Sequence, residues 1–216
     1  MAYFSKKKIL NLYSGIGGNR VYWDELGDFE ITAVELYEKI AQIYKDRFPN
    51  DNVVVADAKE YLLENYDKFD FIWASPPCQS HSRIRKFGCD IGKTKPVYPD
   101  MSLYQIIIFL QNYYKGKWAV ENVNPYYEPL IRPNYELDRH LFWCNFTIDS
   151  FKTEKDKKIE YVKVFSFKGF DLSKYKGVRK QQLIRNEVNY KLGKHILKCA
   201  LRKNLFEIEE LFEEAK

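Results

Sequence analysis

Two side chains that could do covalent chemistry follow short apolar stretches of this 216-residue chain. Cys78 stands in the run Ser75-Pro76-Pro77-Cys78-Gln79-Ser80, in which two prolines restrict the backbone and present the next side chain in one orientation. Glu121 follows a second apolar run at 118–120, where pairing with a basic loop is an equal alternative. A thiolate is a nucleophile and a carboxyl group can donate a proton, so the two together suit addition to an electron-poor ring.

The surroundings of Cys78 favour a nucleophile over a structural cysteine. A single cysteine is usually a small buried apolar residue, but nearby positive charge lowers the pKa of a thiol. Arg83, Arg85 and Lys86 follow Cys78 closely, and we expect them to lower its pKa. The cysteines that lack such neighbours are interpreted as structural, and they are Cys89, Cys144 and Cys199.

A glycine-rich turn, Gly15-Ile16-Gly17-Gly18, directly follows the apolar run 8–13. Glycine lets a backbone turn tightly and approach a ligand closely. Glu35 and Asp57 end the next two apolar runs, where they could accept hydrogen bonds from ribose hydroxyls and from an adenine amino group. Asp57 alone is better explained as a helix cap. Because Arg20 breaks the full GxGxxG pattern, these residues together predict an adenosine-type ligand without selecting which one.

The segments that carry these residues alternate between strand and helix. This alternation predicts an α/β fold with a doubly wound, mostly parallel sheet. The expected strands are Lys8–Tyr13, Glu30–Leu36, Val53–Ala56, Phe69–Ala74 and Trp118–Val120, and the expected helices are Asn19–Leu26, Tyr37–Phe48, Ala58–Asn65 and Met101–Tyr114.

The pattern changes after Pro125. Strands of another kind are expected at Leu141–Ile148 and Tyr161–Phe167, and helical spacing returns from Lys180 to Asn204. Acids alternate with apolar residues from Phe206 to Lys216, as they do in an amphipathic helix.

The charge of the chain is unevenly distributed. The formal net charge is +5, but residues 151–180 carry ten basic and four acidic side chains, so the rest of the chain sums to −1. A second basic stretch runs from Arg83 to Lys95. Such runs are usually solvated loops, but they also suit phosphate contacts, because positive side chains release counterions from nucleic acid.

Composition excludes several classes of protein. With 45% hydrophobic and 17% aromatic residues, the chain is not generally disordered. No apolar run approaches the roughly 18 residues of a membrane span, and the N-terminus is a poor signal peptide. The four cysteines form no CxxC pair and the three histidines lie far apart in sequence, so we expect no metal site and a reduced, cytoplasmic protein.

Three ordered motifs resemble those of the C5-cytosine DNA methyltransferases. They are Leu12-Tyr13-Ser14-Gly15-Ile16-Gly17-Gly18, then Ser75-Pro76-Pro77-Cys78-Gln79-Ser80, then Glu121-Asn122-Val123. The resemblance covers Lys8 to about Phe146 and resumes less clearly from Arg179 to Leu201. In detail the chain is most similar to the small phage and prophage members.

The resemblance implies S-adenosylmethionine as cofactor, with S-adenosylhomocysteine as product. It assigns Glu35 to the ribose and Asp57 to the adenine. Leu36 stands where the family commonly has a tryptophan, so apolar contact would replace an aromatic face. The implied cofactor-binding residues are Tyr13, Ser14, Gly15, Gly17, Gly18, Glu35, Leu36, Asp57, Ala58 and Pro76.

The resemblance also implies a mechanism. Cys78 would add to C6 of a cytosine that has left the DNA stack, while Glu121 holds N3 and the exocyclic amine. C5 would then take the methyl group, and loss of the C5 proton and of Cys78 would restore the ring. Residues 82–100 correspond to the family's mobile catalytic loop. The implied nucleic-acid contacts are Gln79, Ser82, Arg83, Arg85 and Lys86.

Two positions depart from the family pattern. Where members usually carry an R-x-R pair, this chain has Asp138-Arg139-His140. Either Arg139 is displaced by one position or His140 replaces one arginine, and we predict Arg139 as the third catalytic residue. The family's G-N-x-V helix start corresponds to Gly193-Lys194-His195-Ile196, with Asn189 as an open substitute for the missing asparagine.

The predicted organisation is a catalytic core at 1–146, a minimal target recognition insert at 147–177 and a helical segment at 178–216 that returns to the core. A short insert predicts a short recognition sequence in double-stranded DNA, read by a monomer. Three other readings stay open: an RNA cytosine methyltransferase, a catalytically silent DNA-binding protein and a nicotinamide-dependent oxidoreductase. Four aromatic residues are interpreted as the insert's own small core, although for each one taken alone ordinary packing is the better explanation, and they are Tyr161, Phe165, Phe167 and Tyr175.

Overall fold

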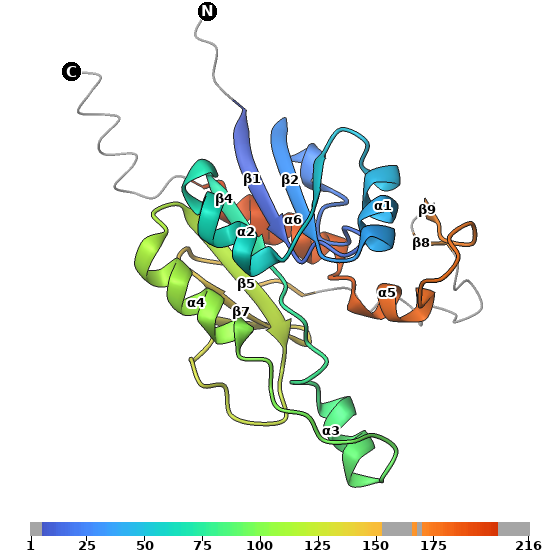
Figure 1. The fold of residues 1–216 in the computed structure, drawn as a ribbon. Coiled ribbons are helices and arrows are strands. Elements are labelled where there is room, and N and C mark those ends of the chain that lie inside the picture. The colour runs from blue at the N-terminus through green and yellow to red at the C-terminus, as the bar shows by residue number, and fades with distance from the viewer. Residues whose placement is uncertain (1–5, 153–165, 168–169, 203–216) are drawn as a thin grey trace, which may run out of the picture.

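The computed structural model describes residues 6–152, 166–167 and 170–202. Its centre is a seven-stranded sheet in the order β3-β2-β1-β4-β5-β7-β6 (Figure 1). The strands are β1 Lys7–Leu12, β2 Phe29–Glu35, β3 Asn52–Val55, β4 Phe71–Ala74, β5 Lys117–Val123, β6 Tyr135–Leu137 and β7 His140–Cys144.

Strands β1 to β5 pair in parallel, whereas β7 runs antiparallel to both β5 and β6. The strand order reverses between β1 and β4, which is where ligands bind in open α/β sheets. The predicted doubly wound, mostly parallel sheet is therefore confirmed. Five carboxyl ends, including those of β1, β4 and β5, meet along one edge.

Both faces of the sheet are covered, as the alternation along its strands requires. In β4, Phe71 and Trp73 pack into one apolar cluster, and Ile72 and Ala74 pack into the other. Figure 1 shows α2 and α4 in front of the sheet and α6 behind it. The α-helices are α1 Glu38–Arg47, α2 Ala58–Asn65, α3 Arg83–Asp90, α4 Ser102–Tyr113, α5 Lys180–Asn186 and α6 Tyr190–Ala200, with 3-10 turns η1 Trp23–Glu25 and η2 Tyr66–Lys68.

The predicted helix Asn19–Leu26 is wrong, because only the 3-10 turn η1 forms there. Tertiary contacts override the local helical spacing. The Asn19 side chain exchanges hydrogen bonds with Asn11 of β1 at 2.9 and 3.4 Å. Trp23 is fully buried and donates its indole N–H to the carbonyl of Gly193 at 3.2 Å.

The C-terminal part also differs from expectation. The helical stretch from residue 180 is broken into α5 and α6 at residues 187–189. Two antiparallel strands of two residues each, β8 Ser166–Phe167 and β9 Phe170–Asp171, pair with each other within the expected recognition insert. Tyr161, Phe165 and the expected helix 206–216 lie outside the described residues.

Tyr175 does not belong to a separate core of the insert. Its ring stacks with Phe170 and its hydroxyl donates to Asp46 of α1 at 2.6 Å. Both aromatic rings pack against a cluster that includes Ile16 and Ile43 of the catalytic core. The expectation of a self-contained aromatic core is therefore wrong for this residue.

Candidate active site

Cys78 lies in a tight turn just beyond β4. The His81 backbone N–H donates to the Cys78 carbonyl at 3.1 Å and closes the turn. On the other side, Asn122 of β5 donates its side-chain amide to the Pro76 carbonyl at 2.9 Å. The proline pair is therefore tied to β5, the strand that carries Glu121.

The thiol of Cys78 is half-buried and close to two charged groups. Burial and, to a smaller extent, the negative charge of Glu121 together raise the pKa of Cys78 to about 11, while Arg139 acts in the opposite direction. The expectation that Arg83, Arg85 and Lys86 lower this pKa is wrong. These three side chains point to other partners, and Arg139 is the cation that acts on the thiol.

Glu121 is buried within β5, which extends through the whole Glu121-Asn122-Val123 motif. His140 begins the neighbouring strand β7, and its Nε2 lies 3.5 Å from Oε1 of Glu121. Both side chains are less than a tenth exposed. Nδ1 of His140 is buried without a hydrogen-bond partner among the described residues. His140, rather than Arg139, therefore occupies the position next to the carboxylate.

Arg139 lies in the two-residue turn between β6 and β7. The residue before it, Asp138, has a φ of +56°, a strained value for a residue with a side chain. Arg139 donates to the carbonyl of Arg185 at 3.3 Å, so its side chain spans the turn and the end of α5. From this place it still acts electrostatically on Cys78.

Residues 82–100, which we call the α3 arm, contain α3 and project away from the sheet (Figure 1). Ser82 caps the helix by accepting from the Ile84 N–H at 3.2 Å. Arg83 donates to the Pro125 carbonyl and to Asn124, both at 2.9 Å, and so ties the arm to the segment after β5. Within the arm, Arg85 donates to the Lys95 carbonyl and Lys86 pairs with Asp90, whereas Gln79 precedes the arm, next to Cys78, and is exposed.

The three glycines of the predicted cofactor turn have different surroundings. Gly15 has a φ of +52°, and a Cβ there would meet nothing within 4 Å. Gly17 has a φ of +78°, and a Cβ there would meet Phe48 and Tyr44 of the α1 region. A Cβ on Gly18 would lie 2.8 Å from the side chain of Glu187. Gly15 alone therefore faces open space, whereas the other two permit close packing.

Glu35 holds this turn against β2. Its two carboxylate oxygens accept the backbone N–H groups of Gly15 and Tyr37, each at 3.0 Å. Burial raises the pKa of Glu35, against these hydrogen bonds. Asp57 is the N-cap of α2 and accepts the N–H groups of Lys59 and Glu60 through Oδ1. The cap reading of Asp57 is thus correct, and Oδ2 is the oxygen left for a ligand.

The carboxyl edge of β1 to β3 suits an adenosine-containing cofactor. Leu36, Tyr37 and Val55 are each more than half exposed, although they border the buried Glu35. The Oγ of Ser14 is buried without a partner among the described residues. Apolar surface, an open glycine and polar groups therefore converge at this edge. Two further predicted residues belong to this edge. Ala58 is buried and is the first residue of α2, and Tyr13 interacts electrostatically with Asp57.

The expected helix start at Gly193 is wrong. Helix α6 begins at Tyr190, and Asn189 caps it by accepting the Lys191 and Leu192 N–H groups. Gly193 lies inside the helix, where a Cβ would stand 2.3 Å from the Asn19 carbonyl oxygen. The segment that faces the glycine turn is Glu187–Val188, which precedes α6.

Glu187 connects this segment to α1 and to the glycine turn. Its Oε1 lies 2.6 Å from Nη1 of Arg47, which also donates to the Ile16 carbonyl at 2.8 Å. Both side chains are less than a tenth exposed. Burial raises the pKa of Glu187 to about 7, against the opposite effect of Arg47.

Sequence reasoning missed the role of Arg20, although it noticed the position. Arg20 is buried and makes two hydrogen bonds to Asp51, at 2.9 and 3.0 Å, just before β3. It also pairs with Asp24 at 2.8 Å. The residue that replaces the third glycine of the GxGxxG pattern thus links the cofactor turn to β3. No sequence signal identified Asp51 as its partner.

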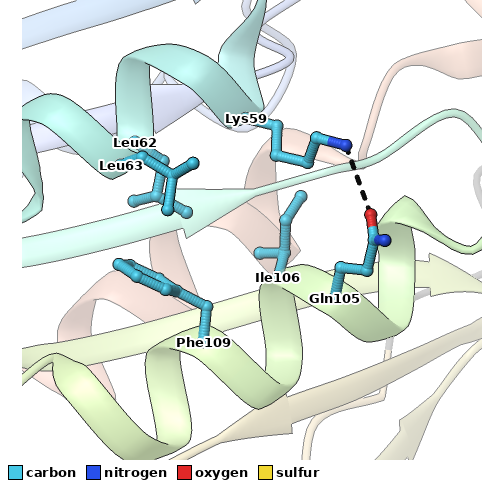
Figure 2. A pocket seen from close by; sticks show the side chains of 6 residues that line it. All are labelled: Lys59, Leu62, Leu63, Gln105, Ile106 and Phe109. Atoms are coloured by element: carbon cyan, nitrogen blue, oxygen red, sulfur yellow. Dashed lines mark hydrogen bonds between the residues drawn. The ribbon is translucent and has the colours of Figure 1, made fainter.

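A cavity of about 320 Å³ lies between α2 and α4. Figure 2 shows apolar side chains along it and a hydrogen bond from Lys59 to Gln105 at 3.3 Å. It contains no predicted site residue. Its lining is Lys59, Leu62, Leu63, Gln105, Ile106 and Phe109.

Two features are absent from the part of the chain that the structure describes. No group of three or more histidine, cysteine, aspartate or glutamate side chains there is arranged to hold a metal ion. No helix in these ranges is long and apolar enough to cross a membrane.

Known proteins resemble part of this chain. The curated tRNA (cytosine(38)-C(5))-methyltransferase of Spodoptera frugiperda is 34% identical over 148 residues, which cover 67% of this chain and 43% of that protein. Type II methyltransferase M.HindV of Haemophilus influenzae is 36% identical over 122 residues, which cover 54% and 37%. The aligned part therefore spans less than half the length of either relative. A solved structure of Spodoptera frugiperda DNMT2 aligns over 55% of this chain at 28% identity, with a TM-score of 0.40.

The match to a family model is the decisive comparison. The model for the C-5 cytosine-specific DNA methylases matches residues 7–124, more than half of the chain. That range holds the glycine turn, the Cys78 turn and Glu121, in the order that the motifs predicted. The same match confirms S-adenosylmethionine as the cofactor. This chain therefore belongs to the C-5 cytosine-specific DNA methylase family.

Proposed function

We propose that this chain methylates C5 of cytosine in double-stranded DNA through a covalent bond to Cys78. The observation that carries the proposal is that Cys78 follows β4 and Glu121 lies in the paired strand β5, which Asn122 ties to the end of β4 through the Pro76 carbonyl. Glu121 and Arg139 therefore act electrostatically on the thiol. A nucleophile, a carboxyl group and a cation are thereby brought together, and β4, which leads to Cys78, pairs with β1, which leads to Gly15. The cofactor supplies an electrophilic methyl group and leaves as S-adenosylhomocysteine.

Cys78 and Glu121 divide the work on the ring. The Cys78 thiolate forms a bond to C6 of a cytosine that has left the stack, and negative charge moves toward N3. A protonated Glu121 donates to N3 and offsets that charge, while its other oxygen accepts from the exocyclic amine. After methylation, the N3 proton returns to Glu121, water takes the C5 proton, the C6–S bond breaks and the thiolate is restored.

Protonation of Glu121 also helps Cys78. The negative charge of Glu121 is one reason why the pKa of Cys78 is raised. When Glu121 holds a proton, that repulsion disappears and the thiolate becomes easier to form. Arg139 stabilises the thiolate directly by its positive charge. A single proton on Glu121 therefore makes the thiolate easier to form and also offsets the negative charge that develops on N3 after the attack.

The α3 arm supports a nucleic-acid substrate. Besides its basic residues, it exposes Ile84, Phe87 and Tyr98, of which Tyr98 is 96% exposed. Positive charge offsets phosphates, and exposed apolar side chains can fill the space that a flipped base leaves. We infer that residues 147–177 form a small recognition element, and that the recognition sequence is correspondingly short.

The choice of DNA over RNA is tested by competition. Wild type would be incubated with labelled cofactor, duplex DNA and tRNA, with Cys78→Ser as the inactive control. We expect label in DNA, and bisulfite sequencing should then reveal a short methylated consensus. Label in tRNA alone would instead support the second candidate, tRNA cytosine methylation. That candidate is favoured by the curated tRNA methyltransferase, which aligns over 67% of this chain.

A further inference from the structure

Two contacts hold the ends of the α3 arm close to the residues that follow Cys78. Ser82, at the start of the arm, bridges to Pro125. At the end of the arm, the Asp100 backbone N–H donates to Oγ of Ser80 at 2.9 Å. Both ends of the arm therefore meet next to the residues that follow Cys78.

His81 lies at the centre of this junction and is 1% exposed. Its Nδ1 is 2.6 Å from the hydroxyl of Tyr127, and its carbonyl accepts the Tyr126 N–H at 3.1 Å. Burial lowers the pKa of His81, which favours the neutral imidazole. The contact is therefore a hydrogen bond between two uncharged groups.

Tyr127 connects this junction to helix α4. Its hydroxyl accepts a hydrogen bond from Tyr104 at 3.3 Å, and Tyr104 is 3% exposed. The Tyr104 hydroxyl in turn accepts the Leu130 N–H at 3.2 Å. The segment that follows Glu121 is thus held against α4 on one side and against His81 on the other.

Cys78 is consequently held from two directions. Asn122 binds the Pro76 carbonyl two residues before Cys78, and Tyr127 binds His81 three residues after it. Both anchors come from β5 and the chain just beyond it, which also carry Glu121. The distance between thiol and carboxyl group then depends on both anchors.

We propose that His81 and Tyr127 form a latch that positions Cys78 relative to Glu121. The latch rests on the proposed function, because its purpose is alignment for attack on a base. His81 and Tyr127 are positioning residues and do not touch the ring. Loss of the latch should slow the covalent step while leaving the binding of cofactor and DNA unchanged.

The test uses pairs of variants that differ in one hydrogen bond. Tyr127→Phe removes only the hydroxyl. His81→Asn keeps a polar atom close to the place of Nδ1, whereas His81→Gln moves it to the place of Nε2. Tyr104→Phe is the control, because it removes a hydroxyl from the same cluster without touching His81.

The first readout is the single-turnover rate of covalent trapping on 5-fluorocytosine DNA. We expect Tyr127→Phe and His81→Gln to trap about tenfold more slowly, which corresponds to one hydrogen bond. His81→Asn and Tyr104→Phe should stay within about threefold of wild type, and DNA affinity should not change. The double variant Tyr127→Phe/His81→Gln should be no slower than either single variant. Equal slowing by Tyr127→Phe and Tyr104→Phe would overturn the latch.

The second readout needs no substrate and separates the latch from the proposed function. Iodoacetamide alkylation of Cys78 is followed by mass spectrometry in wild type and Tyr127→Phe. A released turn should expose the thiol, so alkylation should become several-fold faster, and an unchanged rate would overturn the latch. If wild type traps neither DNA nor RNA, the proposed function fails, and the alkylation result still decides on the latch.

Discussion

His140 Nε2 lies 3.5 Å from Glu121 Oε1, between the antiparallel strands β5 and β7. The contact is buried on both sides, so it is shielded from solvent and the geometry of Glu121 depends on it. Family members usually have an arginine pair near this place. Here a histidine lies inside the sheet and the arginine lies one residue earlier, in the turn.

This contact predicts different effects for two similar substitutions. In His140→Gln the side-chain amide reaches the place of Nε2, so kcat should stay within about threefold of wild type. In His140→Asn the amide stops at the place of Nδ1, and kcat should fall about tenfold or more, with an unchanged KM for DNA. Steady-state kinetics test this, and thermal unfolding shows that both variants are folded. Equal kcat values for the two variants would contradict a role for Nε2.

Arg20 predicts a stability difference between its two acidic partners. Asp51 is 4% exposed and binds the guanidinium through two hydrogen bonds, whereas Asp24 is 69% exposed. Asp51→Asn leaves a buried cation poorly compensated, and should lower the free energy of unfolding by about 3 kcal/mol. Asp24→Asn should cost less than about 1 kcal/mol. Urea unfolding measures both, and a smaller loss for Asp51→Asn than for Asp24→Asn would refute the buried pair.

The strands and helices of the core were predictable because their signals are local. Helix α2 forms at Ala58–Asn65 as expected, since Asp57 caps it and apolar residues recur at helical spacing. The helix expected at 19–26 does not form, because Asn19 is committed to Asn11 of β1, and Arg20 and Trp23 are committed to partners far away in sequence. Strand β6 was not predicted, since three residues carry too little pattern.

The identity of the site residues was more predictable than their electrostatics. Motif order placed Cys78 and Glu121 at one edge, because parallel strands end there. The sequence neighbours of Cys78 suggested a lowered pKa, but helix α3 carries Arg83, Arg85 and Lys86 toward other partners. The raised pKa comes from burial and from Glu121, forty-three residues later in the sequence. The charges around a side chain depend on the tertiary fold, so they cannot be predicted from its neighbours in the sequence.

Two glycines predict different consequences of a single added methyl group. Gly193→Ala would place Cβ against the Asn19 backbone, which cannot move away easily, so stability should fall by about 2 kcal/mol or more. Gly15→Ala meets no atom within 4 Å, although its φ of +52° adds strain of about 1 kcal/mol. Its methyl group would enter the open space beside Glu35, so affinity for S-adenosylmethionine should fall about tenfold or more. Calorimetric titration and thermal unfolding distinguish the two effects; retained cofactor affinity in Gly15→Ala would argue against this crevice.

The raised pKa of Cys78 predicts a steep pH dependence of its reactivity. With a pKa of about 11, only about one thiol in a thousand is ionised at pH 8, against roughly a quarter for a free cysteine. The deprotonated form reacts, so alkylation of Cys78 in the ligand-free protein should rise about tenfold per pH unit between pH 7 and 10.

Glu121→Gln removes a negative charge, lowers the pKa of Cys78 and should speed its alkylation at pH 8. Arg139→Gln removes the opposing cation and should slow it. Peptide mass spectrometry reads Cys78 separately from Cys89, and a plateau below pH 9 in wild type would be incompatible with a thiol whose pKa is raised by burial and by Glu121.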